Sequence, residues 1–237
     1  RSQDGLKFLD KATKLKPQEA MFYYNYGIAL RTAGDQVKAI EALTRAIQLN
    51  PDHADALSQL IDIHQKRHEW ERAIALLKQL ANLRSLDADS FKRLGEALHQ
   101  TKNYTEAATY LSKAAGLAPE DAAIHHQWGL SLQAAGDNAG AAVAYKKSLE
   151  LNPDLAPAHN NLAIVLAEQG HNEEAVKHYE QALDMNSKLF QTKCNLGGLL
   201  RKMGRLEESI EWLRSAVEQK SDCAEALCNL GNTYGDM

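Results

Sequence analysis

Six side-chain amides recur along the chain at one spacing, and an amide is a group that can bind a peptide backbone. Their positions differ by 34 residues or a multiple of 34: Asn25, Gln59, Gln127, Asn161, Asn195 and Asn229. Each offers a hydrogen-bond donor and an acceptor, as the peptide group does, so a row of amides matches an extended chain whatever its side chains are. In the alternative, structural interpretation, the amides bond only to neighbouring helices.

Residue patterns for catalysis or metal binding are weak. His64 and His68 have the four-residue spacing of a helical zinc pair, but no acidic third ligand accompanies them and His68 falls in a predicted turn. The sequence contains no phosphate-binding loop of the form G-x-x-x-x-G-K-[ST]. We therefore predict no catalytic residue, no metal, no cofactor and no enzymatic activity.

Composition and charge narrow the classes of partner. The chain has 237 residues, a net charge of −4 and 6% aromatic residues, which gives no general attraction to nucleic acid or anionic lipid. No apolar run approaches the roughly 20 residues of a membrane span, so we expect no direct membrane insertion. Three cysteines without metal-ligand spacing are typical of reduced thiols, which favours a cytoplasmic location.

The elements that would position the amides follow from an internal repeat. Small residues recur with the 34-residue period in two series: Gly27, Gly95, Gly129, Gly197 and Gly231, and Ala39, Ala73, Ala107, Ala141, Ala175 and Ser209. A fixed period of this length is the signature of a solenoid. The small residues mark places where two helix backbones approach closely.

Each 34-residue unit reads as two helices. In residues 20–53, apolar residues share one face of a first helix and another face of a second helix. Gly34 lies between the helices, where the left-handed backbone of a helix end favours glycine. His68 and Lys102 replace this glycine in two units, at a cost of about 1 kcal/mol each if the left-handed backbone is kept.

This pattern resembles the tetratricopeptide repeat family, and the resemblance covers the whole chain. It implies an all-α fold, an α-solenoid of helix pairs that forms a right-handed superhelix with a concave groove. We expect a single solenoid over residues 1–237, with half repeats at 1–19 and 224–237 and full repeats at 20–53, 54–87, 88–121, 122–155, 156–189 and 190–223.

In this family the first helix of each repeat lines the concave surface, which would place the amides in the groove. The row of amides is similar to the one in the tetratricopeptide arm of O-linked N-acetylglucosamine transferases, which binds protein substrates through their backbone. The resemblance therefore implies that the peptide-binding residues are Asn25, Gln59, Lys92, Arg93, Gln127, Asn160, Asn161, Asn195, Arg201 and Asn229.

Charged residues at the inward positions suggest different preferences at the two ends. Acidic residues around Lys92 and Arg93, Asp62 among them, would repel a C-terminal carboxylate and favour a basic segment near residues 54–121. Arg201, together with Lys202 and Arg205, would favour an acidic segment.

Four hypotheses for function follow. The first is a protein–protein interaction scaffold that binds extended peptides in its groove. The alternative is the substrate-recruiting, non-catalytic arm of a larger enzyme such as a glycosyltransferase, because the chain stops at Met237 within a repeat. RNA binding would need a basic groove, so we expect no nucleic acid partner. Self-association through the uncapped end at 224–237 is the fourth hypothesis.

Overall fold

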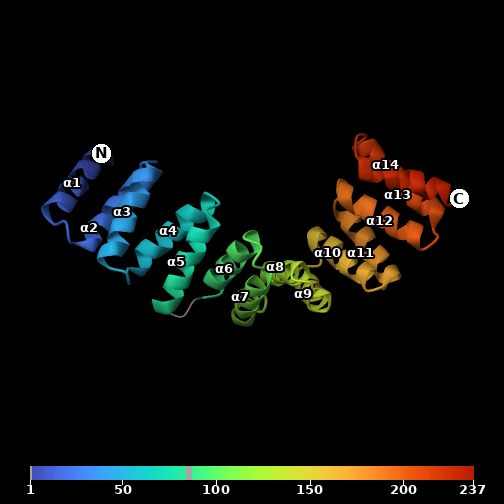
Figure 1. Ribbon diagram of the computed structural model, residues 1–237, viewed down its shortest axis with the longest axis horizontal. Coiled ribbons are helices and arrows are strands. Elements are labelled where there is room, and N and C mark those ends of the chain that lie inside the picture. The colour runs from blue at the N-terminus through green and yellow to red at the C-terminus, as the bar shows by residue number, and fades with distance from the viewer. Residues whose placement is uncertain (1, 84–86) are drawn as a thin grey trace. The chain divides into compact units, whose positions relative to one another are not determined.

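The computed structural model describes residues 2–83 and 87–237, and all regular secondary structure in these residues is α-helical (Figure 1). The prediction of an all-α solenoid is confirmed. The chain divides into two compact units, residues 1–117 and 118–237.

In the first unit, consecutive helices pack against one another along the chain. The helices are α1 (Ser2–Leu15), α2 (Ala20–Thr32), α3 (Gln36–Leu49), α4 (Ala54–Lys66), α5 (Trp70–Leu83), α6 (Ala88–Gln100) and α7 (Tyr104–Leu117).

The second unit repeats this arrangement. Its helices are α8 (Ala122–Ala134), α9 (Asn138–Leu151), α10 (Ala156–Glu168), α11 (Asn172–Met185), α12 (Phe190–Lys202), α13 (Leu206–Gln219) and α14 (Ala224–Gly235). In both units the even-numbered helices are the first helices of the pairs, and they begin 34 residues apart. None of the helices in the described residues combines the length and apolar character that crossing a bilayer requires.

The turn inside each pair ends the first helix with a left-handed residue. After α2, the N–H of Gly34 donates to the carbonyl of Arg31 and the N–H of Asp35 donates to that of Leu30, which is the Schellman pattern. The φ of Gly34 is 87°. His68 and Lys102, which replace this glycine in two repeats, keep the left-handed backbone, with φ of 57° and 62°.

The glycines of the first helices allow the close approach that the period predicts. A Cβ built on Gly197 would lie 2.5 Å from Cγ of Leu213 on the second helix of that pair. A Cβ on Gly129 would lie 2.5 Å from the Tyr145 ring. Alanines of the second helices are buried as well, and Ala39 and Ala141 are fully buried. The helix pairs therefore present their first-helix side chains at fixed, repeating positions.

Candidate functional site

In the first unit, several polar residues on α2, α4 and α6 bind one another. Arg31 donates from Nη1 to Oε1 of Gln59 and lies 3.8 Å from Oδ2 of Asp62. Arg93 donates to Oε1 of Gln65 at 2.7 Å and to Oδ1 of Asp62 at 2.6 Å. The predicted residues Gln59 and Arg93 therefore already have partners within the chain.

This network changes the electrostatics expected around Lys92 and Arg93. The sequence suggested an acidic surface there, but the two arginines pair with the carboxylate of Asp62. Lys92 is half-buried and makes no ion pair with any described residue. Asn25 on α2 is exposed and has no hydrogen-bond partner among the described side chains.

In the second unit, Asn160 and Asn161 on α10 are held by neighbouring helices. Nδ2 of Asn161 lies 3.1 Å from Nε2 of His126 on α8, and Oδ1 of Asn161 accepts from Nδ2 of Asn160 at 3.1 Å. Thr192 on α12 donates to Oδ1 of Asn160 at 2.8 Å. Burial lowers the pKa of His126, which keeps its ring neutral and able to accept. These contacts fit the structural interpretation of the amides at these two positions.

Gln127 on α8 is half-buried, and none of the described residues gives its amide a hydrogen bond. It also lies outside the pockets described below. It is therefore an equivalent amide that neither hydrogen-bonds a described residue nor lines the cavity that Asn195 and Asn229 share.

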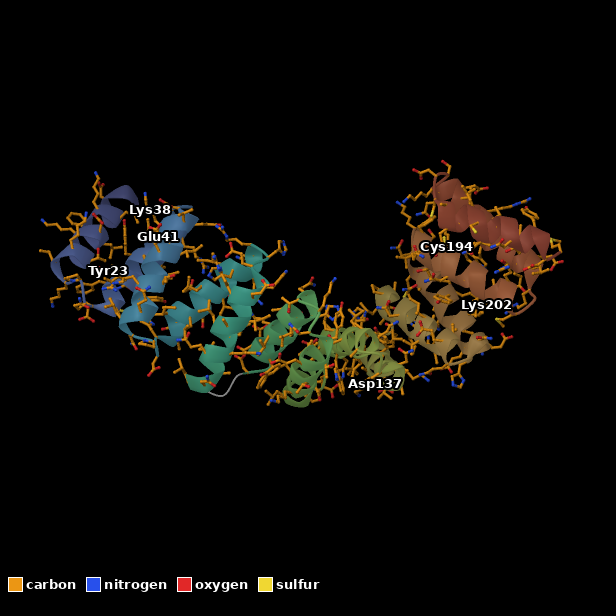
Figure 2. The ribbon with its side chains drawn as sticks, viewed as in Figure 1. Tyr23, Lys38, Glu41, Asp137, Cys194 and Lys202 are labelled. Carbon is orange, nitrogen blue, oxygen red and sulfur yellow. The ribbon has the colours of Figure 1, made fainter. Side chains whose placement is uncertain are left out.

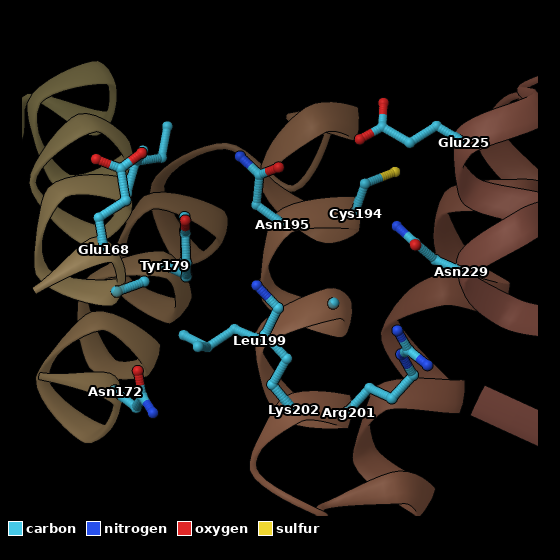
Figure 3. Close-up of a pocket in the computed structure, with 13 residues that line it drawn as sticks. Glu168, Asn172, Tyr179, Cys194, Asn195, Leu199, Arg201, Lys202, Glu225 and Asn229 are labelled. Atoms are coloured by element: carbon cyan, nitrogen blue, oxygen red, sulfur yellow. The ribbon is translucent and has the colours of Figure 1, made fainter. Parts of the chain in front are cut away.

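Two predicted amides line a cavity of about 490 Å³ built by α10, α11, α12 and α14 (Figure 3). The residues around it are Ile164, Ala167, Glu168, Asn172, Tyr179, Cys194, Asn195, Gly198, Leu199, Arg201, Lys202, Glu225 and Asn229. Figure 3 shows Asn229 extending from α14 toward Cys194 on α12. Gly198 lies beside this side chain, since a Cβ built there would be in ordinary contact, 3.9 Å, with Nδ2 of Asn229.

The amides in this cavity retain hydrogen-bonding capacity. The contact recorded for the Asn195 amide is a long one, 3.4 Å from Nε2 of Gln191, and Gln191 also lies 3.3 Å from the Glu225 carboxylate. None of the described groups hydrogen-bonds the Asn229 side chain. An extended ligand in the cavity would find both donors and acceptors available.

Basic and acidic groups flank these amides. Arg201 donates from Nη1 to Oδ2 of Asp236 at 2.9 Å, while its buried Nε has no partner among the described residues. Lys202 makes no ion pair with any described residue. Figure 2 shows its side chain and that of Cys194 on α12. Arg205 binds Glu208 at 2.6 Å and Arg201 binds Asp236, so Lys202 is the member of the positive group expected at 201–205 that has no ion pair with a described residue.

Cys194 is buried in the wall of this cavity. Burial, aided by Cys223 and Glu225, raises the pKa of its thiol to about 11. Its thiol is therefore protonated at neutral pH and packs as a small apolar group in the cavity wall.

The histidines considered as a zinc pair have other roles. His64 is buried, and its Nδ1 lies 2.6 Å from Oε2 of Glu69. Hydrogen bonds from Arg67 and His64 hold the pKa of Glu69 at about 2. The described residues contain no cluster of three or more potential metal ligands.

Sequence reasoning missed one polar pair. Nδ1 of His159 on α10 lies 2.9 Å from Nδ1 of His178 on α11. The two residues are 19 positions apart, so neither the 34-residue period nor the periodicity of one helix pointed to the contact.

Comparison with protein families identifies the repeat. Models described as tetratricopeptide repeat or TPR repeat match residues 1–54, 30–93, 88–121, 120–188 and 197–237. The chain belongs to the tetratricopeptide repeat family.

Solved structures share the fold. YrrB, a tetratricopeptide protein with an unusual peptide-binding site, is 21% identical with a TM-score of 0.69, over 78% of this chain and 95% of YrrB. MamA is 26% identical with a TM-score of 0.63, over 68% of this chain and 95% of MamA. The C-terminal part of a repeat protein from Cytophaga hutchinsonii is 13% identical with a TM-score of 0.72, over 97% and 94%. A search of curated protein sequences finds no match.

The repeats and these relatives support a coarse functional conclusion. The chain is a protein-interaction scaffold built from tetratricopeptide repeats.

Proposed function

We propose that this scaffold binds an extended peptide segment in the cavity between α10, α12 and α14. The observation that carries the proposal is the pair Asn195 and Asn229, two amides at equivalent repeat positions that line one cavity with hydrogen-bonding capacity left over. An amide pair separated by one repeat can bond successive peptide groups of an extended chain.

The charges around the cavity suggest how the peptide is oriented. Arg201 and Lys202 lie toward one end of the α12 segment that lines it, while Glu225 lies near Asn195 through their shared contact with Gln191. A peptide with an acidic side chain near Arg201 would complement this arrangement, although Asp236 already binds one arm of the guanidinium. Specificity would therefore rest on Lys202 and on the displacement of Asp236.

The fold of YrrB supports this use of the scaffold. YrrB is described as having an unusual peptide-binding site, and its structure superposes on most of this chain. We propose a non-catalytic role, in which the chain holds a protein segment without transforming it. The recruiting arm of a larger enzyme remains the alternative prediction, and it would use the same cavity.

Peptide selection followed by mapping tests the proposal. A displayed peptide library is selected on the full chain, and an isolated peptide is then titrated while backbone amide spectra are recorded. We expect shifts at Asn195, Gly198 and Asn229 and none on α2 or α4, where Arg31 and Gln59 bind each other. Shifts confined to the first unit would contradict the proposed site, and a selection that yields no binding peptide would contradict peptide binding.

A further inference from the structure

The cavity between α10, α12 and α14 has an acidic edge. Figure 3 shows the carboxylates of Glu168 on α10 and Glu225 on α14 on either side of the Asn195 amide, at the same end of the cavity. Both glutamates are exposed, so a ligand can reach them. Neither makes an ion pair with a described residue: Glu168 accepts from Nδ2 of Asn138 at 2.7 Å, and Glu225 lies 3.3 Å from Nε2 of Gln191. These partners are neutral amides, so they leave the negative charges unbalanced.

Two groups in the wall of the cavity respond to these charges. Burial and the negative charge of Glu168 raise the pKa of the Tyr179 hydroxyl. Burial, Cys223 and Glu225 raise the pKa of the Cys194 thiol. The two carboxylates therefore act on the interior of the cavity as well as facing solvent.

The opposite edge of the cavity is basic, and Lys202 provides its unpaired charge. Figure 3 shows Arg201 and Lys202 at the other end of the α12 segment that lines the cavity, lower in the view than Asn195. Positions 195 and 202 are separated by about 10 Å along the axis of this helix. Arg201 binds Asp236 at 2.9 Å, whereas the exposed Lys202 has no ion pair with any described residue.

An extended peptide that bonds to Asn195 and Asn229 would run between these two edges. The amides stand on the neighbouring helices α12 and α14, so the peptide passes from one helix to the next. Successive side chains of an extended chain point to opposite sides, roughly perpendicular to the backbone groups that hydrogen-bond. With the backbone held by the amides, every second side chain faces the two carboxylates, and the side chains between them face Lys202.

We propose that the cavity selects an extended peptide in which basic and acidic residues alternate. This inference rests on the peptide-binding function proposed above and adds the charge pattern of the ligand. A lysine or arginine of the peptide binds Glu168 or Glu225, and the next residue, a glutamate or aspartate, binds Lys202. A peptide with charges of one sign would meet like charge at one of the two edges.

Two peptides of identical composition test the alternation. In one blocked octapeptide lysine and glutamate alternate, so each side of the extended chain carries one kind of charge. In the other they follow in pairs, Lys-Lys-Glu-Glu, so both charges occur on both sides. Each is titrated calorimetrically into the full chain at low ionic strength. We expect the alternating peptide to bind about tenfold more tightly, with a smaller difference in salt. Equal binding, or no binding of the alternating peptide, would overturn the inference.

Charge reversal of Lys202 tests the basic edge. Lys202→Glu should bring the ratio of the two affinities close to one, because both edges are then acidic. Lys177→Glu is the matched control, since it makes the same change in net charge at an exposed position of α11 that does not line the cavity. The control should keep the ratio, and circular dichroism checks that both variants are folded. A ratio that persists in Lys202→Glu, or falls equally in both variants, would contradict the role of Lys202.

Neutral amides test the acidic edge. The double variant Glu168→Gln/Glu225→Gln keeps the shape of both side chains and removes their charge, so the preference for the alternating peptide should again fall. An unchanged preference would show that the carboxylates do not select the ligand.

The inference and the proposed function fail in different ways. If a peptide selected from the library shifts the resonances of Asn195 and Asn229 while the two octapeptides bind equally, the charge pattern is wrong and peptide binding in the cavity stands. If no library peptide binds, the proposed function fails, and the inference fails with it.

Discussion

The two units place polar side chains at equivalent repeat positions, but the units differ in whether these side chains already have partners within the chain. In the first unit Arg31, Gln59, Asp62 and Arg93 bind one another across α2, α4 and α6. In the second unit the amides on α12 and α14 line a cavity and keep unused hydrogen-bonding capacity. The comparison teaches that the repeat fixes where a side chain stands, while the side chain one repeat away decides whether it is available to a ligand.

The helix turns differ between the units in a parallel way. The second unit uses glycine at all three left-handed turn positions, Gly136, Gly170 and Gly204, whereas the first unit uses Gly34 and then His68 and Lys102. The backbone shape is the same. The first unit therefore carries local strain that the second unit lacks.

The largest expected effect separates two glycines at the same repeat position. Gly197→Val would push a side chain into Leu213, whose Cγ lies 2.5 Å from the site of the Cβ, and should destabilise the chain by about 3 kcal/mol. Gly231→Ala is the matched control, because a Cβ there meets nothing within 4 Å and alanine favours the helix by about 1 kcal/mol. Denaturant unfolding measures both. If both variants lost similar stability, glycine would be needed at this repeat position whether or not a neighbouring side chain is close, which would contradict this account.

The second expected effect comes from removing the carboxylate at the centre of the polar network in the first unit. Asp62→Ala removes the carboxylate that Arg93 binds at 2.6 Å, and we expect a loss of about 1 kcal/mol of stability. The variant should also gain affinity for acidic peptides, because two arginines lose their anion. Asp55→Ala, at an exposed position on the same helix, should do neither. The variants are compared by unfolding and by peptide titration.

The turns allow the same comparison on a smaller scale. Lys102→Gly should relieve left-handed strain and stabilise the chain by at most about 1 kcal/mol, since glycine also costs entropy in the unfolded state. Gly136→Ala, the reverse change in the second unit, should destabilise it by about 1 kcal/mol. Melting temperatures that do not move in opposite directions would contradict this reading of the turns.

The smallest expected effect is a pH dependence of stability that comes from Glu69 in the first unit. The pKa of Glu69 is about 2 in the folded chain and near 4.5 when unperturbed, so its contribution to stability is present above pH 4.5 and is lost as the pH falls toward 2. Glu69→Gln should therefore reduce the stability difference between pH 6 and pH 3. Glu71→Gln, at an exposed position, should leave that difference unchanged.

The 34-residue period was sufficient to predict the fold. It identified the close approach at Gly197 and the left-handed turn at Gly34, because both depend only on the helix pair that contains them. Whether an amide is free depends on the residue it meets on a neighbouring helix, as Asn161 meets His126.

The most direct test of peptide binding in the second unit compares three amides of one repeat position. A peptide selected on the native chain is titrated calorimetrically into the Asn195→Ala/Asn229→Ala variant and into Gln127→Ala, with helicity checked by circular dichroism. We predict that the double variant loses at least about tenfold in affinity, since each lost hydrogen bond contributes about 1 kcal/mol, while Gln127→Ala binds as the native chain does. Equal affinity of all three proteins would contradict the role of Asn195 and Asn229.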